Sequence, residues 1–226
     1  MNRLRRAILR HGVAGCLVLA ARYTTESLSA VFYRHERHIW YVAAASSVKV
    51  DRSLPAGLKL QRSGREHLDL LSESKLYGWS AAETFFAEGG DLWIVFDGAR
   101  PAFCCWVFRE RMPTVAAPGG WTGLPAKTAC LEGVVTDAAY RGRGIAPAAW
   151  SLIAPSLNEE GIETITMKVE KGNRSMERAV VKAGFQEVAL MDYLYICGLS
   201  RVRVVPLRHL TGPSNEILME VQKLAA

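Results

Sequence analysis

The sequence has few cysteines and none of the spacings that indicate a metal site or a disulfide framework. The five cysteines form no C-x-x-C pair and their number is odd; they are Cys16, Cys104, Cys105, Cys130 and Cys197. Four lie in apolar stretches typical of strands, so we expect buried, reduced thiols, which fits a cytoplasmic protein. The five histidines show no ligand spacing either, and we predict no metal.

The N-terminal segment also lacks a hydrophobic run long enough to cross a membrane. Residues 13–21 are apolar, but this stretch is far shorter than the roughly 20 residues that a spanning helix needs. A basic start followed by an apolar stretch imitates a signal peptide, yet Arg10 and His11 leave no apolar core before Cys16. Apolar residues recur near helical spacing and predict an amphipathic helix instead: Leu4, Ile8, Leu9, Val13, Cys16, Leu17 and Ala20. Its apolar face is expected to pack on protein, and contact with an anionic membrane surface is the alternative.

Excess charge is confined to one end of the chain. The net charge is +6, and residues 1–40 contribute +5 of it. The rest is close to neutral and offers no basic surface typical of nucleic-acid binding, so we predict no nucleic-acid partner. At 226 residues and 50% apolar composition, the chain can bury a sizeable core. We divide it into a basic amphipathic extension, 1–45, and a folded domain, 46–226.

A glycine-rich turn, YRGRGIA at residues 140–146, is the most informative motif. It follows an apolar stretch at 129–135 and precedes a helical pattern at 146–154, so several backbone N–H groups and the positive end of a helix dipole should meet there. Gly142 and Gly144 permit close approach of a phosphate, and Arg141 and Arg143 add charge. The turn matches neither G-x-x-x-x-G-K-[ST] nor G-x-G-x-x-G, which excludes the common mononucleotide and dinucleotide loops.

Two motifs in order resemble the GNAT superfamily of N-acetyltransferases. The spacing R-x-x-G-x-A, from Arg141 to Ala146, resembles the family's pyrophosphate loop. After a predicted strand at 162–169 comes a helical segment that begins at Asn173 and ends in Lys-Ala-Gly-Phe at 182–185, which resembles the family's second motif. The resemblance extends from about residue 58 to about residue 205.

The pattern of elements agrees with the fold that this resemblance implies: an α/β (α+β type) protein with a mixed, largely antiparallel sheet of six to seven strands, flanked by helices, plus an extra N-terminal helix. The predicted strands are 39–43, 58–61, 92–96, 102–108, 129–135, 162–169, 186–196 and 202–205. The predicted helices are 66–77, 80–88, 146–154 and 215–224, together with the asparagine-led segment 173–185. Ser80 is placed as the N-cap of its helix, with Glu83 completing a capping box. Residues 112–127 are rich in Gly, Pro and Thr and are expected to form a loop.

The resemblance also implies the co-substrate, which is acetyl-CoA or another acyl-CoA. The strand before the loop would offer main-chain groups to the pantetheine and acyl carbonyl, the loop would bind the pyrophosphate, and the asparagine would lie close to the coenzyme. The positions that correspond here are Val134, Val135, Thr136, Arg141, Gly142, Arg143, Gly144, Ile145, Ala146 and Asn173. Asn173 has an equally simple interpretation as a helix N-cap.

Glu132 is the candidate base, because it is the one polar side chain in an apolar strand and shares a face with Val134 and Thr136. A paired structural glutamate is the alternative. Many relatives carry a tyrosine on the second-motif helix that protonates the leaving thiolate, but that position holds Val180 here. Tyr193 or Tyr195 on the next strand is the predicted substitute, although thiolate can also leave unprotonated.

The sequence therefore predicts an acyl-CoA-dependent N-acyltransferase that transfers acetyl to a primary amine of a small molecule by direct attack in a ternary complex. A long-chain acyltransferase using acyl-carrier protein or acyl-CoA near a membrane is the first alternative. A non-catalytic acyl-CoA-binding module is the second. The expected partner is a small-molecule amine, and an acyl-carrier protein, peripheral membrane contact through the N-terminal helix and a homodimer stay open.

Overall fold

The structure is a computed structural model that describes residues 32–48, 53–208 and 212–225. The predicted N-terminal helix and Cys16 lie outside these residues. The strands are β1 (Tyr33–Ala44), β2 (Leu58–Ser63), β3 (Asp91–Asp97), β4 (Arg100–Phe108), β5 (Arg111–Pro113), β6 (Trp121–Gly123), β7 (Thr128–Thr136), β8 (Thr164–Glu170), β9 (Gln186–Ile196) and β10 (Leu199–Pro206). The α-helices are α2 (Leu68–Glu73), α3 (Trp79–Ala87), α4 (Ile145–Glu159), α5 (Arg174–Lys182) and α6 (Pro213–Lys223).

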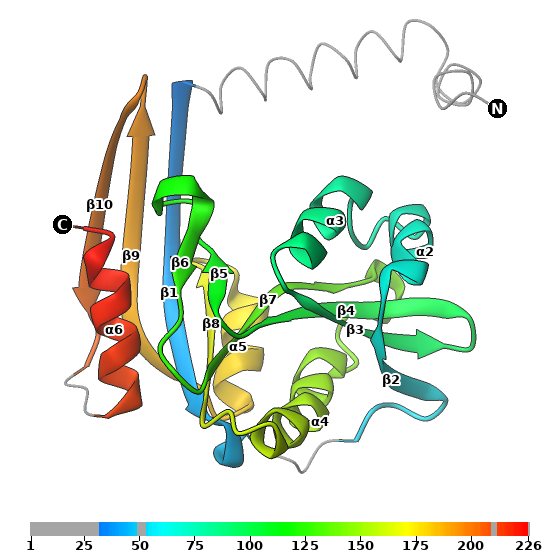
Figure 1. The fold of residues 1–226 in the computed structure, drawn as a ribbon. Coiled ribbons are helices and arrows are strands. Elements are labelled where there is room, and N and C mark those ends of the chain that lie inside the picture. Colours follow the sequence, from blue (N-terminus) through cyan, green and yellow to red (C-terminus); the bar gives the residue numbers. More distant parts are fainter. Residues whose placement is uncertain (1–31, 49–52, 209–211, 226) are drawn as a thin grey trace, which may run out of the picture.

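Eight strands form one sheet in the order β10-β9-β1-β8-β7-β4-β3-β2, and β5 pairs with β6 in a separate hairpin. Neighbouring strands of the large sheet are antiparallel except β7 and β8, which are parallel. The predicted mixed, largely antiparallel sheet is confirmed (Figure 1). The parallel pair requires a crossover, and α4 supplies it.

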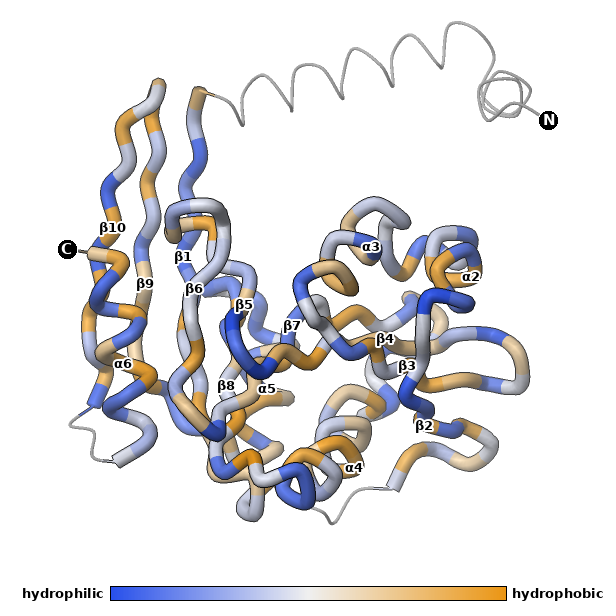
Figure 2. The backbone as a smooth tube through the Cα atoms, in the orientation of Figure 1, coloured by the Kyte–Doolittle hydropathy of each residue, from blue (hydrophilic) through white to orange (hydrophobic). Residues whose placement is uncertain are grey.

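Two hydrophobic cores cover the two faces of this sheet. One joins α4 and α5 to the sheet and includes Tyr41, Trp150 and Met167. The other joins α2, α3 and α6 to the opposite face and includes Trp40 and Trp106. Hydrophobic positions, orange in Figure 2, follow α4 and the middle strands for this reason. Among the described residues, no helix is long and apolar enough to cross a membrane.

Strand β1 is an integral part of the sheet, which corrects two expectations. It lies between β8 and β9, so the sheet has eight strands rather than six or seven. The division at residue 45 also fails to separate an extension from the domain, because the segment 33–44 pairs along most of its length with both neighbours. Ile39 and Tyr41 face one core while Trp40 and Val42 face the other. Residues 40–43 are buried on both faces of the sheet, which explains why they show no polar alternation.

Three local expectations differ from the structure. The helix predicted at 66–77 is a short 3-10 turn followed by α2, which ends at Glu73. The N-cap of α3 is Gly78 rather than Ser80, and Glu83 pairs with Arg65 instead of completing a capping box. The predicted loop 112–127 contains the β5–β6 hairpin, which Trp121 anchors through ring contacts with Phe85 and Phe108.

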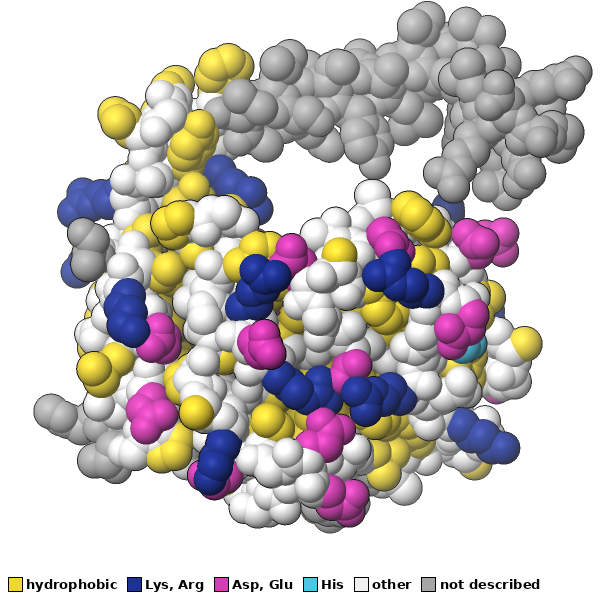
Figure 3. Space-filling view, in the orientation of Figure 1, with side chains coloured by type: hydrophobic (Ala, Val, Ile, Leu, Met, Phe, Trp, Pro, Cys, Tyr) yellow, Lys and Arg dark blue, Asp and Glu magenta, His cyan; other side chains and the backbone are white. Residues whose placement is uncertain are grey.

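The charged side chains on the face shown in Figure 3 are interleaved in sign. Arg109, for example, pairs with both Asp91 and Glu160, and Arg62 pairs with the same two carboxylates. Exposed ion pairs of this kind contribute little stability each, so burial of apolar residues on both faces holds the sheet together.

The position of β1 leads to a test of stability. Trp40 is fully buried (0% exposed), so Trp40→Ala should lower the free energy of unfolding by about 3–5 kcal/mol. Tyr33 lies on the same strand but is 54% exposed, and Tyr33→Ala should change it by less than about 0.5 kcal/mol. Urea denaturation followed by circular dichroism measures both. Equal, small effects would show that β1 is not part of the cooperative core.

Candidate functional site

The site begins where two parallel strands separate. β7 and β8 are paired only at Thr128–Thr164, Ala129–Ile165 and Cys130–Thr166. Beyond this point the backbone of β7 has no partner on its β8 side, although β7 itself continues to Thr136. Unpaired backbone N–H and C=O groups at a partly buried position need another partner, and a ligand lying along β7 would supply one.

A bulge in β7 coincides with this separation. Trp106 pairs with Glu132 and Cys104 with Val135, so two residues of β7, Gly133 and Val134, face one residue of β4. Gly133 has φ of 57°, and a Cβ there would lie 2.9 Å from Cδ1 of Trp106. Only glycine fits both the backbone conformation and the space, and the bulge bends β7 next to the gap.

The glycine-rich turn joins β7 to α4 as the sequence predicts. Gly142 (φ 78°) and Gly144 (φ 75°) are left-handed, and Gly144 is the N-cap of α4. Among the residues that the structure describes, no side chain caps the first turn of α4. Its N–H groups are therefore available to an anion, which the helix dipole would also favour.

Side-chain hydrogen bonds brace the start of the turn and the residues that precede it. Asp137 accepts a hydrogen bond from the Ala139 N–H (2.8 Å) and pairs with Arg100 (3.1 Å), and these two contacts lower the pKa of Asp137. The Tyr140 hydroxyl donates to Asp97 (2.8 Å), and this bond raises the pKa of Tyr140. Arg141 Nε donates to the Thr136 carbonyl (3.2 Å). These contacts restrain the backbone at the start of the turn.

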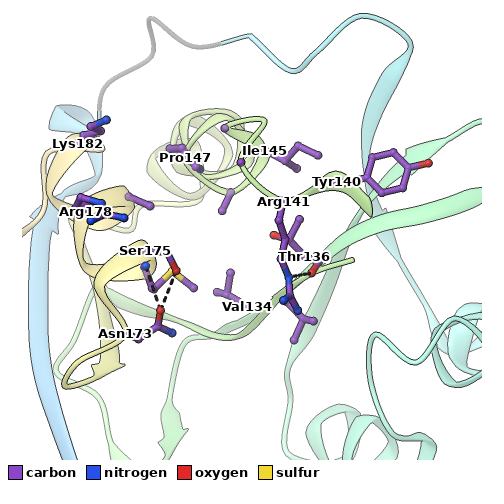
Figure 4. Close-up of a pocket in the computed structure, with 16 residues that line it drawn as sticks. Val134, Thr136, Tyr140, Arg141, Ile145, Pro147, Asn173, Ser175, Arg178 and Lys182 are labelled. Carbon is purple, nitrogen blue, oxygen red and sulfur yellow. Dashed lines mark hydrogen bonds between the residues drawn. The ribbon is translucent and has the colours of Figure 1, made fainter. Parts of the chain in front are cut away.

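A pocket of about 700 Å³ lies between the turn, the end of β7 and α5. Figure 4 shows Ile145 and Pro147 of α4 on one side, Asn173, Arg178 and Lys182 of the α5 segment on another, and Val134 below. Nine of the ten predicted cofactor residues line it: Val134, Val135, Thr136, Arg141, Gly142, Gly144, Ile145, Ala146 and Asn173. Arg143 does not; its guanidinium lies over the Tyr140 ring at 5.2 Å.

Sequence reasoning missed the helical side of this pocket. Seven more residues line it: Tyr140, Pro147, Ser175, Met176, Arg178, Ala179 and Lys182. The spacing of Ser175, Arg178 and Lys182 places them on one face of α5 and could have been read from the sequence. The pocket therefore has three cationic side chains, which suit a polyanionic ligand: Arg178 and Lys182 on this face and Arg141 opposite.

Asn173 has both of the roles that the sequence left open. Its side chain is the N-cap of α5 and accepts a hydrogen bond from the Met176 N–H (3.3 Å) and from the Ser175 hydroxyl (3.0 Å). It also lines the pocket. Pro147 stands in the first turn of α4, where its missing N–H removes no intrahelical bond.

A second pocket of about 230 Å³ continues into the gap between β7 and β8. It shares Val134, Val135, Asn173 and Met176 with the first pocket. Glu132 lines it and forms an ion pair with Lys168. Lys168 Nζ also donates to the Pro113 carbonyl (2.7 Å) and thereby ties the β5–β6 hairpin to the sheet.

The structure does not bring the predicted acids to either pocket. Tyr193 and Tyr195 lie on β9, two strands away from β8, and line neither pocket. Val180, at the position of the family's tyrosine, is fully buried in the core between α5 and the sheet. Among the described residues, no cluster of three or more His, Cys, Asp or Glu could hold a metal ion.

A sequence model of the Acetyltransferase (GNAT) family matches residues 66–185. No curated protein matches the chain significantly.

Three solved structures share the fold at low sequence identity. A putative GNAT-family acetyltransferase from Novosphingobium aromaticivorans has 18% identity and a TM-score of 0.50, over 70% of this chain and 63% of its own. A GNAT-family acetyltransferase from Colwellia psychrerythraea has 11% identity and a TM-score of 0.51, over 76% and 61%. A GCN5-related N-acetyltransferase from Kribbella flavida has 16% identity and a TM-score of 0.50, over 77% and 64%.

This chain thus covers somewhat less than two thirds of the length of each of those three structures. At this level of identity the likeness shows a shared fold alone. The family match covers more than half of the chain, including the turn after β7 and the segment that opens α5. The chain therefore belongs to the GNAT family of acetyltransferases.

Proposed function

We propose that this protein transfers an acyl group, most simply acetyl, from acyl-CoA to a primary amine of a small molecule. One observation carries the proposal: the N-terminus of α4, which follows the glycine-rich turn, has no side-chain cap within the described residues and lies at one end of the first pocket. The second pocket continues from there into the gap between β7 and β8. The turn and the cations of α5 suit the phosphates of the coenzyme. The unpaired edge of β7 suits its amide-containing arm.

Direct attack of the amine on the thioester fits the chemistry of the site better than a covalent enzyme intermediate. Cys104, Cys105 and Cys130 are buried, and burial raises the pKa of each thiol, that of Cys104 to about 12. A thiol that stays protonated is a poor nucleophile. The remaining described cysteine, Cys197, directly follows β9 and lines neither pocket.

The acceptor would approach the gap from the face of the sheet opposite α4 and α5. Glu132, Tyr77 and Trp106 lie on this side, where Trp106 is opposite Glu132 in the ladder and Tyr77 packs on Trp106. The Glu132 carboxylate would attract a cationic amine, although Lys168 partly neutralises it.

We call the space in front of the glycine-rich turn the phosphate cradle. Filling this space should abolish coenzyme binding. Nothing lies within 4 Å of a Cβ built on Gly144, so the indole of Gly144→Trp would occupy the cradle itself. Acetyl-CoA affinity, measured by calorimetry, should fall by more than about 100-fold, which corresponds to about 2.7 kcal/mol.

Gly161→Trp is the matched control. Gly161 also has positive φ (85°) and open space around its Cβ, but it follows α4 at the opposite end and does not line the pocket. This variant bears similar backbone strain and should keep normal affinity. Undiminished binding by Gly144→Trp would disprove the assignment of the turn.

The brace around the turn should contribute to affinity without touching the ligand. Asp137→Ala removes the contacts to Ala139 and Arg100 and frees the turn, so acetyl-CoA affinity should fall roughly tenfold, the equivalent of losing one capping interaction. Asp192→Ala removes a half-buried carboxylate that pairs with His35 and Arg37 on β1, far from the turn, and should leave affinity unchanged. Equal affinities in calorimetry would show that the turn needs no brace.

A further inference from the structure

His38 is a titratable side chain that motif analysis did not single out and that the structure places at the reaction site. It lies on β1 and lines the second pocket with Glu132, Lys168 and Glu170. In the ladder it is opposite Glu170, two positions from the Trp40–Lys168 pair, so its side chain is on the face of the sheet that carries Lys168. This is the side from which the acceptor would approach.

The His38 imidazole makes no hydrogen bond within the described part of the chain. Nδ1 is completely buried without a partner, and the nearest carboxylate oxygen is Glu36 Oε2, at 3.8 Å. A buried polar nitrogen without a partner is uncommon in a native structure and calls for an explanation. A proton on Nδ1, held toward Glu36, leaves Nε2 as a free acceptor.

The surroundings keep this imidazole neutral. Burial lowers the pKa of His38, and the nearby Lys168 ammonium lowers it further. The carboxylates of Glu36, Glu132 and Glu170 act in the opposite direction but do not reverse the shift. His38 is therefore unprotonated at neutral pH, which is the form that can accept a proton.

Glu132, the base predicted from the sequence, is less available. Its Oε2 already accepts a hydrogen bond from Lys168, whose ammonium is itself fixed by the Pro113 carbonyl. Lys168 is largely buried, with 9% of its side chain exposed, so removing this contact would leave a buried charge without a partner. The arrangement favours Glu132 as the group that holds Lys168.

We propose that His38, rather than Glu132, takes the proton from the acceptor amine. The inference rests on the proposed acyltransferase function and assigns the proton transfer within the same site. Glu36, on the same strand, does not line the second pocket and would act on the ring only through its charge.

The step balances without a further reactant. The neutral amine nitrogen forms a bond with the thioester carbonyl carbon, and the C–S bond breaks with its electron pair on sulfur. The amine proton passes to Nε2 of His38, directly or through one water. The imidazolium then gives its proton to the thiolate or to solvent, which yields the amide, the thiol and a neutral imidazole.

The test compares His38→Gln with the wild-type protein in an assay of thiol release from acetyl-CoA. The acceptors are a panel of diamines, amino acids, amino sugars and short lysine peptides. Turnover by His38→Gln should fall by at least about 100-fold, the contribution typical of a general base. Acetyl-CoA affinity in calorimetry should stay unchanged. The wild-type rate should decline at acid pH as His38 becomes protonated, and this limb of the pH profile should be absent from the variant.

Two controls make the outcome decisive. His35 lies on the same strand, and its exposed imidazole pairs with Asp192. The His35→Gln variant should retain both the rate and the pH profile of the wild-type protein. Glu132→Gln tests the competing base. If His38→Gln keeps the acid limb and Glu132→Gln loses it, the assignment to His38 is overturned. If the wild-type protein binds acetyl-CoA but acetylates no amine, the proposed function fails and the assignment fails with it.

Discussion

The separation of β7 from β8 is the constraint on which the site depends. Two parallel strands that stayed paired would satisfy each other's backbone groups and close the sheet. Here pairing stops after Cys130 and Thr166; the second pocket lies in the resulting gap, and the first pocket adjoins it. The bulge at Gly133 and the crossover through α4 act together, since one bends β7 and the other carries the chain away from it. The backbone of β7 is therefore left without a β8 partner in the middle of a stable sheet, within the described part of the chain.

The sequence predicts the glycine-rich turn and the helix after it well because both are local. A turn with glycines at two left-handed positions, followed at once by a helix, can be recognised from adjacent residues such as Gly142 and Gly144. Most strands and the hairpin at Asp97 and Gly98 are recognisable for the same reason, since each depends on a short alternation or a turn signal. Arg143 shows the limit of this reasoning, because sequence cannot tell whether an arginine faces the ligand or, as here, stacks on Tyr140.

The second pocket could not be predicted in the same way, because its lining comes from segments that are distant in the sequence. His38, Glu132 and Lys168 come from β1, β7 and β8, and nothing in their local sequence indicates that they meet. The ion pair between Glu132 and Lys168 changes the interpretation of Glu132 the most. A single carboxylate in an apolar strand looks like a tuned base, whereas a carboxylate paired with a buried lysine has its charge already engaged.

The insertion of β1 links the fold to the chemistry. A strand from the start of the chain lies beside β8, buries Trp40 and Tyr41 in opposite cores and thereby fixes its own register. That register places His38 next to the gap, where a shift of one residue would direct the imidazole into the core under α4 and α5. The apolar residues that hold β1 in place thus also set the position of an ionisable group. A protein built on the same sheet without this strand would have to obtain its proton acceptor elsewhere.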